Sequence, residues 1–154
     1  MPDVYAIDSS VYIPALRNGN ELVALRQFLR MARRNVVVAG VVAMELRAGA
    51  STAQHVNAVD ALLEQYAQRE LVIAASCAAH VEAGRVLAAL VARERVVLAQ
   101  APRSLTADVL IATTCREHNV VLITANDGDF TAIQRHLRGF RFIAPWPTGP
   151  RALR

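Results

Sequence analysis

The sequence predicts an α/β fold with a central parallel sheet of about five strands and helices on both faces. This prediction depends on two hydrophobic patterns that alternate along the chain. Short runs rich in β-branched residues are typical of buried strands, and longer segments with apolar residues at helical spacing separate them. Such alternation favours parallel strands joined by right-handed crossovers. The predicted strands are Val4–Ile7, Val36–Ala39, Leu71–Ala74, Val120–Ile123 and Phe140–Ile143.

Apolar residues with a period of 3.6 predict the helices between these strands. In one segment, Leu25, Phe28 and Ala32 fall on a single helical face. The last long helix is expected to begin after Ser104, whose side chain suits a helix N-cap. The predicted helices are Glu21–Arg34, Thr52–Gln68, Val81–Arg93, Leu105–His118 and a short one at Phe130–Leu137.

Composition indicates one globular domain with a substantial core. The chain has 154 residues, of which 54% are hydrophobic and 19% charged. Its formal net charge is +4, and every one of its 17 basic residues is an arginine. The absence of lysine disfavours a Walker A phosphate loop, which needs that residue. A basic surface suits a polyanion such as RNA or DNA, and it is equally typical of a mildly basic protein without such a ligand.

Four acidic residues stand beside or inside apolar segments, where a carboxylate is costly to bury. Asp8 ends the run VYAID, and Asp129 follows the strand-like run VVLIT. Glu45 lies in VVVAGVVAMELRAG, and Asp108 interrupts LTADVLIATTC. A buried carboxylate needs a partner or a cation. We therefore expect the four side chains to converge and to hold a divalent metal ion.

The predicted topology can bring these acids to one edge of the sheet. Asp8 and Asp129 follow the first and fourth strands, and open parallel sheets bind ligands outside the carboxyl ends of their strands. Glu45 and Asp108 are expected in the first turns of helices that lean over that edge. Taken singly, Asp8 also suits a strand-end turn, and Glu45 also suits an ion pair with Arg47. Asp108 also suits a helix N-terminus, where the helix dipole favours an acid.

Other features predict a cytoplasmic protein without a membrane span. Cys77 and Cys115 have no partner spacing and are expected to be buried free thiols, which fits a reducing compartment. The N-terminus MPDVYAIDSS lacks the regions of a signal peptide, and no apolar run is long enough to cross a membrane. We expect one domain over residues 1–146 and a short tail, rich in Pro and Gly, over residues 147–154.

Four segments, in order, resemble the motifs of the PIN-domain family. AIDSSVYI resembles the opening motif, and VVAMELRAGA resembles the second, in which a Glu leads an ELR-G helix. LTADVLIATTC resembles the third, and VLITANDGDF resembles the fourth, written roughly T-x-N-x-x-D-F. The match spans nearly the whole chain. Its length and the closing segment FRFIAPWP are similar to those of VapC-type toxins of bacterial toxin–antitoxin systems, so the resemblance implies a PIN-like three-layer fold.

The resemblance implies a hydrolase that cuts RNA phosphodiester bonds with Mg²⁺ or Mn²⁺. The family pattern assigns both catalysis and metal binding to Asp8, Glu45, Asp108 and Asp129. The chemistry suits these roles, because hard divalent cations prefer oxygen ligands and can activate water near a phosphate. Sites with one metal ion and with two both stay open.

The fourth motif contains more than one residue that could complete the acidic set. Asn126, Asp127 and Asp129 are all candidates within the fourth motif. The family register favours Asp129 because an aromatic residue follows it, and Asp127 suits a tight turn. Ser10, Asn126 and Thr124 are expected to support the site. A helix N-cap is an equally good interpretation for Ser10, and a local backbone hydrogen bond is favoured for Thr124.

The resemblance also implies an RNA substrate, such as tRNA or another structured RNA, and two protein partners. These are a VapB-like antitoxin and a second copy of the chain in a homodimer. In toxins of this type, helices such as 21–34 and 52–68 form a groove for the antitoxin, although packing on the sheet explains most of their apolar surface. Two alternatives stay open: a non-catalytic PIN-like module that binds RNA or protein, and a PIN nuclease of RNA processing without an antitoxin.

Overall fold

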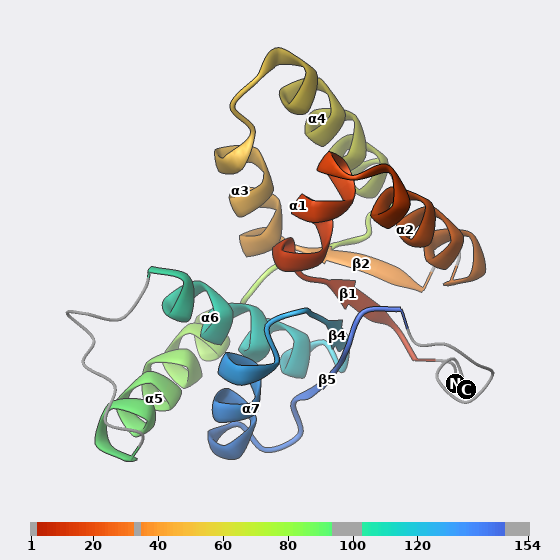
Figure 1. Ribbon diagram of the computed structural model, residues 1–154. Helices are drawn as coiled ribbons and strands as arrows, with labels where there is room; N and C mark the ends of the chain where they lie inside the picture. The colour runs from red at the N-terminus through yellow and green to blue at the C-terminus, as the bar shows by residue number, and fades with distance from the viewer. Residues whose placement is uncertain (1–2, 33–34, 94–102, 147–154) are drawn as a thin grey trace.

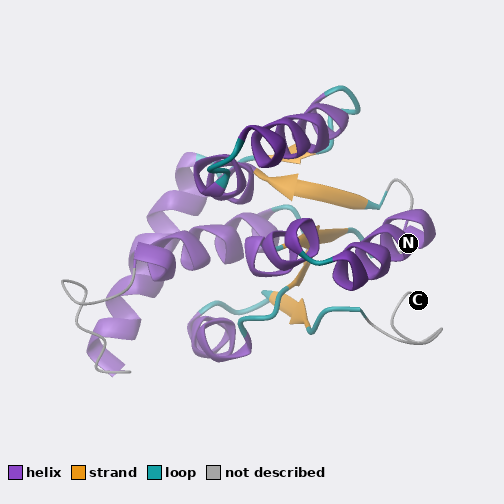
Figure 2. Cartoon of the chain, turned by 45° about the horizontal axis from the view of Figure 1, so that its top comes forward, coloured by secondary structure: helices purple, strands orange, loops and turns teal. Residues whose placement is uncertain are grey.

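The computed structural model describes residues 3–32, 35–93 and 103–146. A five-stranded parallel sheet forms its centre, with the strand order β3-β2-β1-β4-β5. The strands lie side by side with helices packed on both faces (Figure 2). This arrangement confirms the predicted fold class. The strands are β1 (Tyr5–Ile7), β2 (Val36–Ala39), β3 (Val72–Ile73), β4 (Val121–Ile123) and β5 (Arg141–Ile143).

The helices fall into two groups, one on each face of the sheet (Figure 1). The chain moves in one direction across the sheet from β1 to β3 and in the other direction from β4 to β5. Right-handed crossovers place the connecting helices of these two halves on opposite faces. The first group is α1 (Ser9–Arg17), α2 (Gly19–Ala32), α3 (Gly40–Gly49) and α4 (Ala53–Ala67). The second group is α5 (Cys77–Arg93), α6 (Arg103–Glu117) and α7 (Asp127–His136).

The strand order reverses between β1 and β4, which are paired neighbours. Tyr5 lies opposite Val121, and Ile7 lies opposite Ile123. The chain leaves β1 toward α1 on one face and leaves β4 toward α7 on the other face. Side chains that follow these two strands therefore start from adjacent positions, at the place where doubly wound sheets bind ligands.

The core lies between the sheet and both helical layers. All residues of β1, β2 and β4 are buried, which explains why their sequences are continuous apolar runs. Phe130 of α7 is fully buried, and its ring centroid lies 5.9 Å from that of Phe140 and 6.1 Å from that of Phe142. On the other face, the hydroxyl groups of Tyr12 and Tyr66 form a buried hydrogen bond of 2.8 Å. This bond joins α1 to α4.

Two predictions at helix N-termini are wrong. Helix α5 begins at Cys77 and not at Val81, because the Ser76 hydroxyl accepts a hydrogen bond from the backbone N–H of Ala79 at 3.2 Å and allows an earlier start. Helix α6 begins at Arg103, so Ser104 lies inside the helix and is not its cap. The other predicted helices and strands agree with the structure to within about three residues at each end. The predicted tail, residues 147–154, lies outside the described residues.

The cysteines are both free, but only one is buried. Cys115 is inaccessible in the core, as predicted. Cys77 is exposed, so its predicted burial is wrong. The reason is its place as the first residue of α5, since the buried face of this helix begins only at Ala79. No helix within the described ranges is long and apolar enough to cross a membrane.

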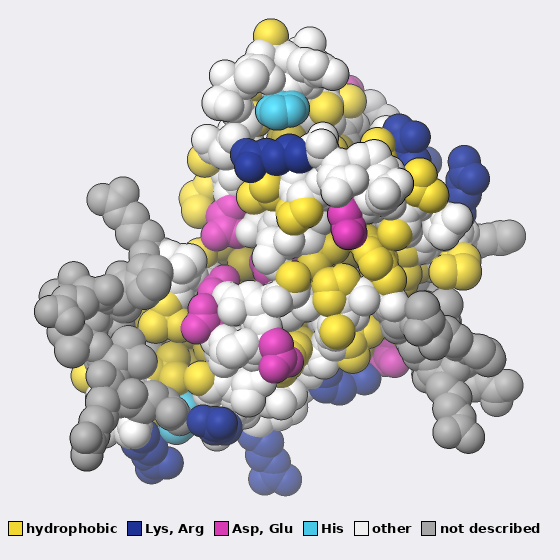
Figure 3. Space-filling view, viewed as in Figure 1, with side chains coloured by type: hydrophobic (Ala, Val, Ile, Leu, Met, Phe, Trp, Pro, Cys, Tyr) yellow, Lys and Arg dark blue, Asp and Glu magenta, His cyan; other side chains and the backbone are white. Residues whose placement is uncertain are grey.

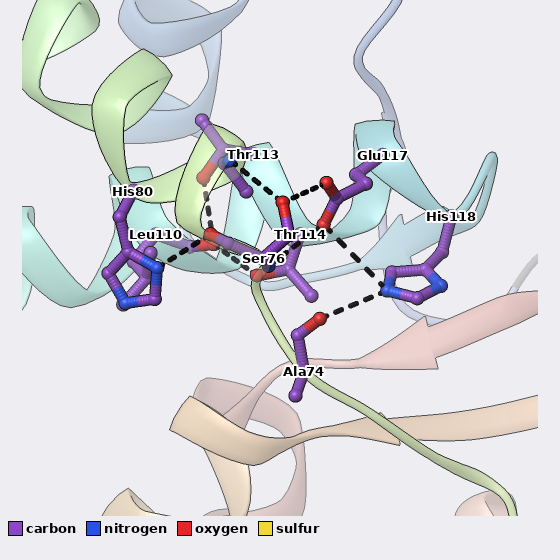
Figure 4. Close-up of polar contacts among 9 residues, drawn as sticks. Ala74, Ser76, His80, Leu110, Thr113, Thr114, Glu117 and His118 are labelled. Atoms are coloured by element: carbon purple, nitrogen blue, oxygen red, sulfur yellow. Dashed lines mark hydrogen bonds and ion pairs between the residues drawn. The ribbon is translucent and has the colours of Figure 1, made fainter.

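A polar cluster ties the start of α5 to the end of α6 (Figure 4). The backbone N–H of Ser76 donates to Glu117 Oε2 at 3.1 Å, and the Ser76 hydroxyl donates to Glu117 Oε1. These contacts lower the pKa of the Glu117 carboxyl. The His118 ring is hydrogen-bonded to the carbonyl of Ala74 at 3.1 Å. The cluster helps to hold α5 against α6, and α6 carries Asp108.

Phe130→Ala should destabilise the protein, because it removes a fully buried ring between two other aromatic residues. We expect a loss of about 3–5 kcal/mol in the free energy of unfolding, measured by urea denaturation. Met31→Ala is the control, since Met31 is 61% exposed and its truncation should change stability by less than about 0.5 kcal/mol. Equal effects of the two substitutions would contradict this account of the core.

Candidate active site

The ends of β1 and β4 form the base of the site. Asp8 follows β1 directly, and its backbone N–H donates to the carbonyl of Ile123, the last residue of β4, at 2.9 Å. The Asp8 side chain is only 2% exposed. Thr124 follows β4 directly, and Asn126 comes two residues later. Pairing of the two strands thus places polar side chains from both halves of the chain at one spot.

Asp8 is held by three hydrogen-bond donors. Its Oδ1 accepts from the backbone N–H of Ser9 at 2.8 Å, which caps α1. Its Oδ2 accepts from the hydroxyl of Ser10 at 2.5 Å and from that of Thr124 at 2.8 Å. Thr124 also accepts from the backbone N–H of Asn126 at 3.0 Å. The local bond expected for Thr124 is therefore present, together with a contact to Asp8 across the sheet.

Asn126 joins two further acids. Its side-chain Nδ2 donates to Asp108 Oδ2 at 3.1 Å and to Asp129 Oδ2 at 2.9 Å. Its Oδ1 accepts from the backbone N–H of Asp129 at 3.4 Å and so caps α7. Asp129 is half-buried, whereas Asp127 is exposed on the first turn of the same helix. The geometry thus favours Asp129 over Asp127 as the acid of this segment that faces the others.

Glu45 reaches the site from α3. Its Oε2 atom is buried and has no hydrogen-bond partner within the described residues. Burial raises the pKa of the Glu45 carboxyl, a hydrogen bond from the Ser9 side chain lowers it, and the charge of Asp8 raises it. The ion pair considered for Glu45 does not form, because Arg47 pairs with Asp60 at 2.8 Å. No sequence pattern paired Ser9 with Glu45. The one sequence signal for a role of Ser9 was its position directly after Asp8.

Asp108 is only 5% exposed. Burial, the largest effect, and repulsion from Asp8, Asp129 and Glu45, in that order, together raise the pKa of its carboxyl to about 7. The hydrogen bond from Asn126 acts in the opposite direction. The four acids therefore share one electrostatic environment, and several acidic side chains gather on the face drawn in Figure 3.

One detail of the predicted arrangement is wrong. Glu45 and Asp108 do not lie in the first turns of their helices. Helix α3 begins at Gly40, directly after β2, and α6 begins at Arg103, so each acid lies in the second turn. Both helices start earlier than the sequence suggested, and a helix dipole at the first turn does not explain either acid.

The residues present fit a hydrated divalent cation. Within the described ranges, no three His, Cys, Asp or Glu side chains form a ready set of ligands around one point. Mg²⁺ does not need such a set, because it keeps several waters and takes only one or two carboxylates directly. A bound cation would give the buried, unpaired Oε2 of Glu45 a partner, and it would offset the repulsion that raises the pKa of Asp108.

Comparison with known proteins identifies the family. The model of the PIN domain family matches residues 5–135. A search of curated proteins finds no match to this chain.

Solved structures with the same fold include DNA-bound VapBC from Salmonella typhimurium, with a TM-score of 0.69, 21% identity and coverage of 94% of this chain and 99% of that chain. VapBC-1 from nontypeable Haemophilus influenzae has a TM-score of 0.67 and 22% identity, with coverage of 92% and 97%. FitAcB from Neisseria gonorrhoeae has a TM-score of 0.66 and 18% identity, with coverage of 93% and 99%. The PIN-like fold is therefore confirmed.

The raised pKa of Asp108 predicts that stability falls as pH rises from about 4 to about 7. In this range the folded state keeps a proton that the unfolded state, with a carboxyl pKa near 3.8, has released. Asp108→Asn removes the dependence, so relative to wild type the variant should gain on the order of 2 kcal/mol between pH 4.5 and pH 8. Urea denaturation in the presence of a chelator measures this. An unchanged pH dependence in the variant would contradict the assignment.

Proposed function

We propose that this chain, which belongs to the PIN-domain family, is a metal-dependent endoribonuclease and the toxin of a toxin–antitoxin pair. One observation carries the proposal. Asp8, Glu45, Asp108 and Asp129 come from four separate segments, yet Asn126 bridges Asp108 to Asp129, and the charges of Asp8, Asp129 and Glu45 all raise the pKa of the Asp108 carboxyl. A fold gains no stability from gathering like charges, so a functional reason is required.

In this proposal the four acids hold Mg²⁺ or Mn²⁺. A divalent ion supplies Lewis acidity, which activates water and offsets the negative charge that develops on a scissile phosphate. The chain itself orients the acids. Ser10 and Thr124 fix Asp8, and Asn126 fixes Asp108 and Asp129. Attack by water in line with the leaving group needs no covalent bond between enzyme and RNA, and no nucleophilic side chain is assigned.

The charge distribution supports a polyanionic substrate. Four of the 13 acids gather at the site, which leaves nine acids against 17 arginines in the rest of the sequence. Such a surface attracts nucleic acid, while the acids themselves repel phosphate unless a cation is bound. Cleavage is then restricted to places where the backbone can approach the ion. We propose single-stranded loops of tRNA or of another structured RNA, whose backbone is accessible.

The fold relatives support a protein partner. The similar structures from Salmonella typhimurium and Haemophilus influenzae are VapBC assemblies. By analogy we propose a VapB-like antitoxin for this chain, which would act in the cytoplasm as a homodimer. The amphipathic helices α2 and α4 are the proposed surface for the antitoxin. This part of the proposal rests on likeness of fold and is therefore tested separately from the chemistry.

Asp8→Asn and Asp108→Asn should each lower the rate of RNA cleavage by at least about 100-fold, because each removes a charge that holds the ion. The measurement uses end-labelled RNA with Mg²⁺ or Mn²⁺, and a chelator should stop cleavage by the wild type. Asp60→Asn is the matched control. It removes an exposed acid that pairs with Arg47 away from the site, and the rate should stay unchanged. Wild-type activity of the Asp8→Asn protein would refute the proposed chemistry.

Expression of the wild-type chain in a bacterial host should arrest growth, and expression of Asp108→Asn should not. Co-expression of the protein encoded by an adjacent small reading frame should restore growth and form a complex that purifies with the chain. Growth is scored by colony counts after induction. If purified wild type cuts RNA but its expression leaves growth unaffected, the nuclease assignment stands and the toxin role fails.

A further inference from the structure

The first turn of α7 contains a peptide bond that the proposed chemistry does not use, between Asp127 and Gly128. It is the only Asp–Gly pair in the sequence. Both residues are exposed, and within the described part of the chain the Asp127 carboxyl makes no hydrogen bond or ion pair. A Cβ atom on Gly128 would meet nothing within 4 Å outside its own turn. The bond is therefore open to solvent, with no contact that holds the Asp127 side chain in place.

The backbone nitrogen of Gly128 is available for reaction with that side chain. Gly128 is the second residue of α7, and the first N–H groups of a helix have no partner within it. No acceptor elsewhere in the described ranges takes this N–H. Glycine also has no side chain to restrict backbone rotation or to shield the nitrogen. The carboxyl carbon of Asp127 and this nitrogen are the two atoms whose bonding closes a succinimide ring.

The turn around this bond is weakly closed. Asn126 Oδ1 accepts from the N–H of Asp129 at 3.4 Å, and the Asn126 carbonyl accepts from the N–H of Phe130 at 3.4 Å. Both distances exceed the usual range for such bonds, which is about 2.7–3.2 Å. Weak bonds allow this end of the helix to open locally while the rest of the protein stays folded. Ring closure needs such an opening, because helical backbone holds the nitrogen away from the carboxyl.

We propose that Asp127 isomerises spontaneously to isoaspartate and that this change disrupts the acidic site. The Gly128 nitrogen attacks the carboxyl carbon of Asp127 and forms a C–N bond, and one water leaves, made from the carboxyl OH and the amide proton. Water then opens the succinimide at one of its two carbonyls. Opening at the side-chain carbonyl restores aspartate. Opening at the main-chain carbonyl gives isoaspartate, in which the chain runs through the former side chain, and neither step needs an oxidant or a reductant.

Isoaspartate would alter the backbone where the site depends on its length. The product has one extra carbon atom in the main chain, which adds about 1.5 Å between Asn126 and Asp129. Asn126 caps α7 through Asp129 and also bridges Asp129 to Asp108. A lengthened chain cannot keep the cap and the bridge at their present distances. The effect on RNA cleavage rests on the proposed function, whereas the isomerisation itself does not.

A bond of similar chemistry joins Asn18 to Gly19, between α1 and α2. There the side-chain Oδ1 of Asn18 accepts from the backbone N–H of Asn20 at 3.0 Å, which holds the side chain in place. Ring closure at Asn18 releases ammonia, and its products are heavier than the starting residue because a carboxyl replaces the amide. Isomerisation at Asp127 leaves the mass unchanged. Peptide mapping by mass spectrometry therefore distinguishes the two positions.

Incubation of the purified full chain in neutral buffer, sampled over several weeks, tests the inference. Isoaspartate is measured by labelling with an isoaspartyl carboxyl methyltransferase and is located by peptide mapping. In the wild type it should accumulate at Asp127, while the midpoint of thermal unfolding and the rate of RNA cleavage both fall. Gly128→Ala should slow accumulation at least about fivefold, because a Cβ restricts the backbone and crowds the nitrogen. Gly84→Ala in α5, where the Cβ also has open space, is the matched control and should accumulate isoaspartate as the wild type does.

Asp127→Ser lacks the reacting carboxyl and should give no isoaspartate at this position, so it decides the test if circular dichroism shows that Gly128→Ala is unfolded. The synthetic peptide TANDGDF is the unfolded reference. If the peptide isomerises and the folded wild type does not, the fold protects the bond and the inference is overturned. Isomerised protein that keeps its unfolding midpoint and cleavage rate also overturns it. If fresh wild type cuts no RNA, the proposed function fails, and labelling and the unfolding midpoint still decide the inference.

Discussion

Parallel pairing of β1 with β4 is the interaction on which the rest of the structure depends. It makes neighbours of two strands that are more than one hundred residues apart in the sequence. The bond from the Asp8 N–H to the Ile123 carbonyl fixes the point where the two chain segments separate. Helices α1 and α7 then leave toward opposite faces. The first turn of α1 supplies Ser9 and Ser10 to Asp8, and Thr124, between β4 and α7, supplies the third donor. Without this pairing the acids would lie on unrelated surfaces.

The site places acids of like charge together in a buried environment. Asp8 and Asp108 are nearly inaccessible, and the charges of the other three acids raise the pKa of the Asp108 carboxyl. Neutral donors from the chain reduce the free-energy cost of burying these acids together. They do not remove it, because hydroxyl and amide groups carry no net charge. Arg47, two residues from Glu45 in the sequence, pairs with Asp60 instead. The protein therefore preserves an acidic site within an otherwise basic chain.

Much of this arrangement could be predicted from the sequence, and the failures have physical causes. Continuous apolar runs identify buried strands, and an acid at the end of such a run must lie at the sheet edge. The position of Asp8 could therefore be predicted. Helix starts were harder to predict, since Ser76 and Ser104 both suit a cap by residue type. Ser76 does accept a capping bond from Ala79, whereas Ser104 lies inside α6. The orientation of Asn126 depends on three hydrogen bonds to two residues, Asp108 and Asp129, on two helices, and no local pattern encodes that.

The hydrogen bond between Tyr12 and Tyr66 has an evolutionary consequence. Loss of one hydroxyl would leave the other buried in the core without a hydrogen-bond partner, which would lower the free energy of unfolding by about 1–3 kcal/mol. Loss of both would be nearly neutral. The two positions should therefore covary among homologues, with Tyr–Tyr and Phe–Phe pairs common and mixed pairs rare. Frequent mixed pairs in an alignment would mean that α1 and α4 are held together by apolar packing alone.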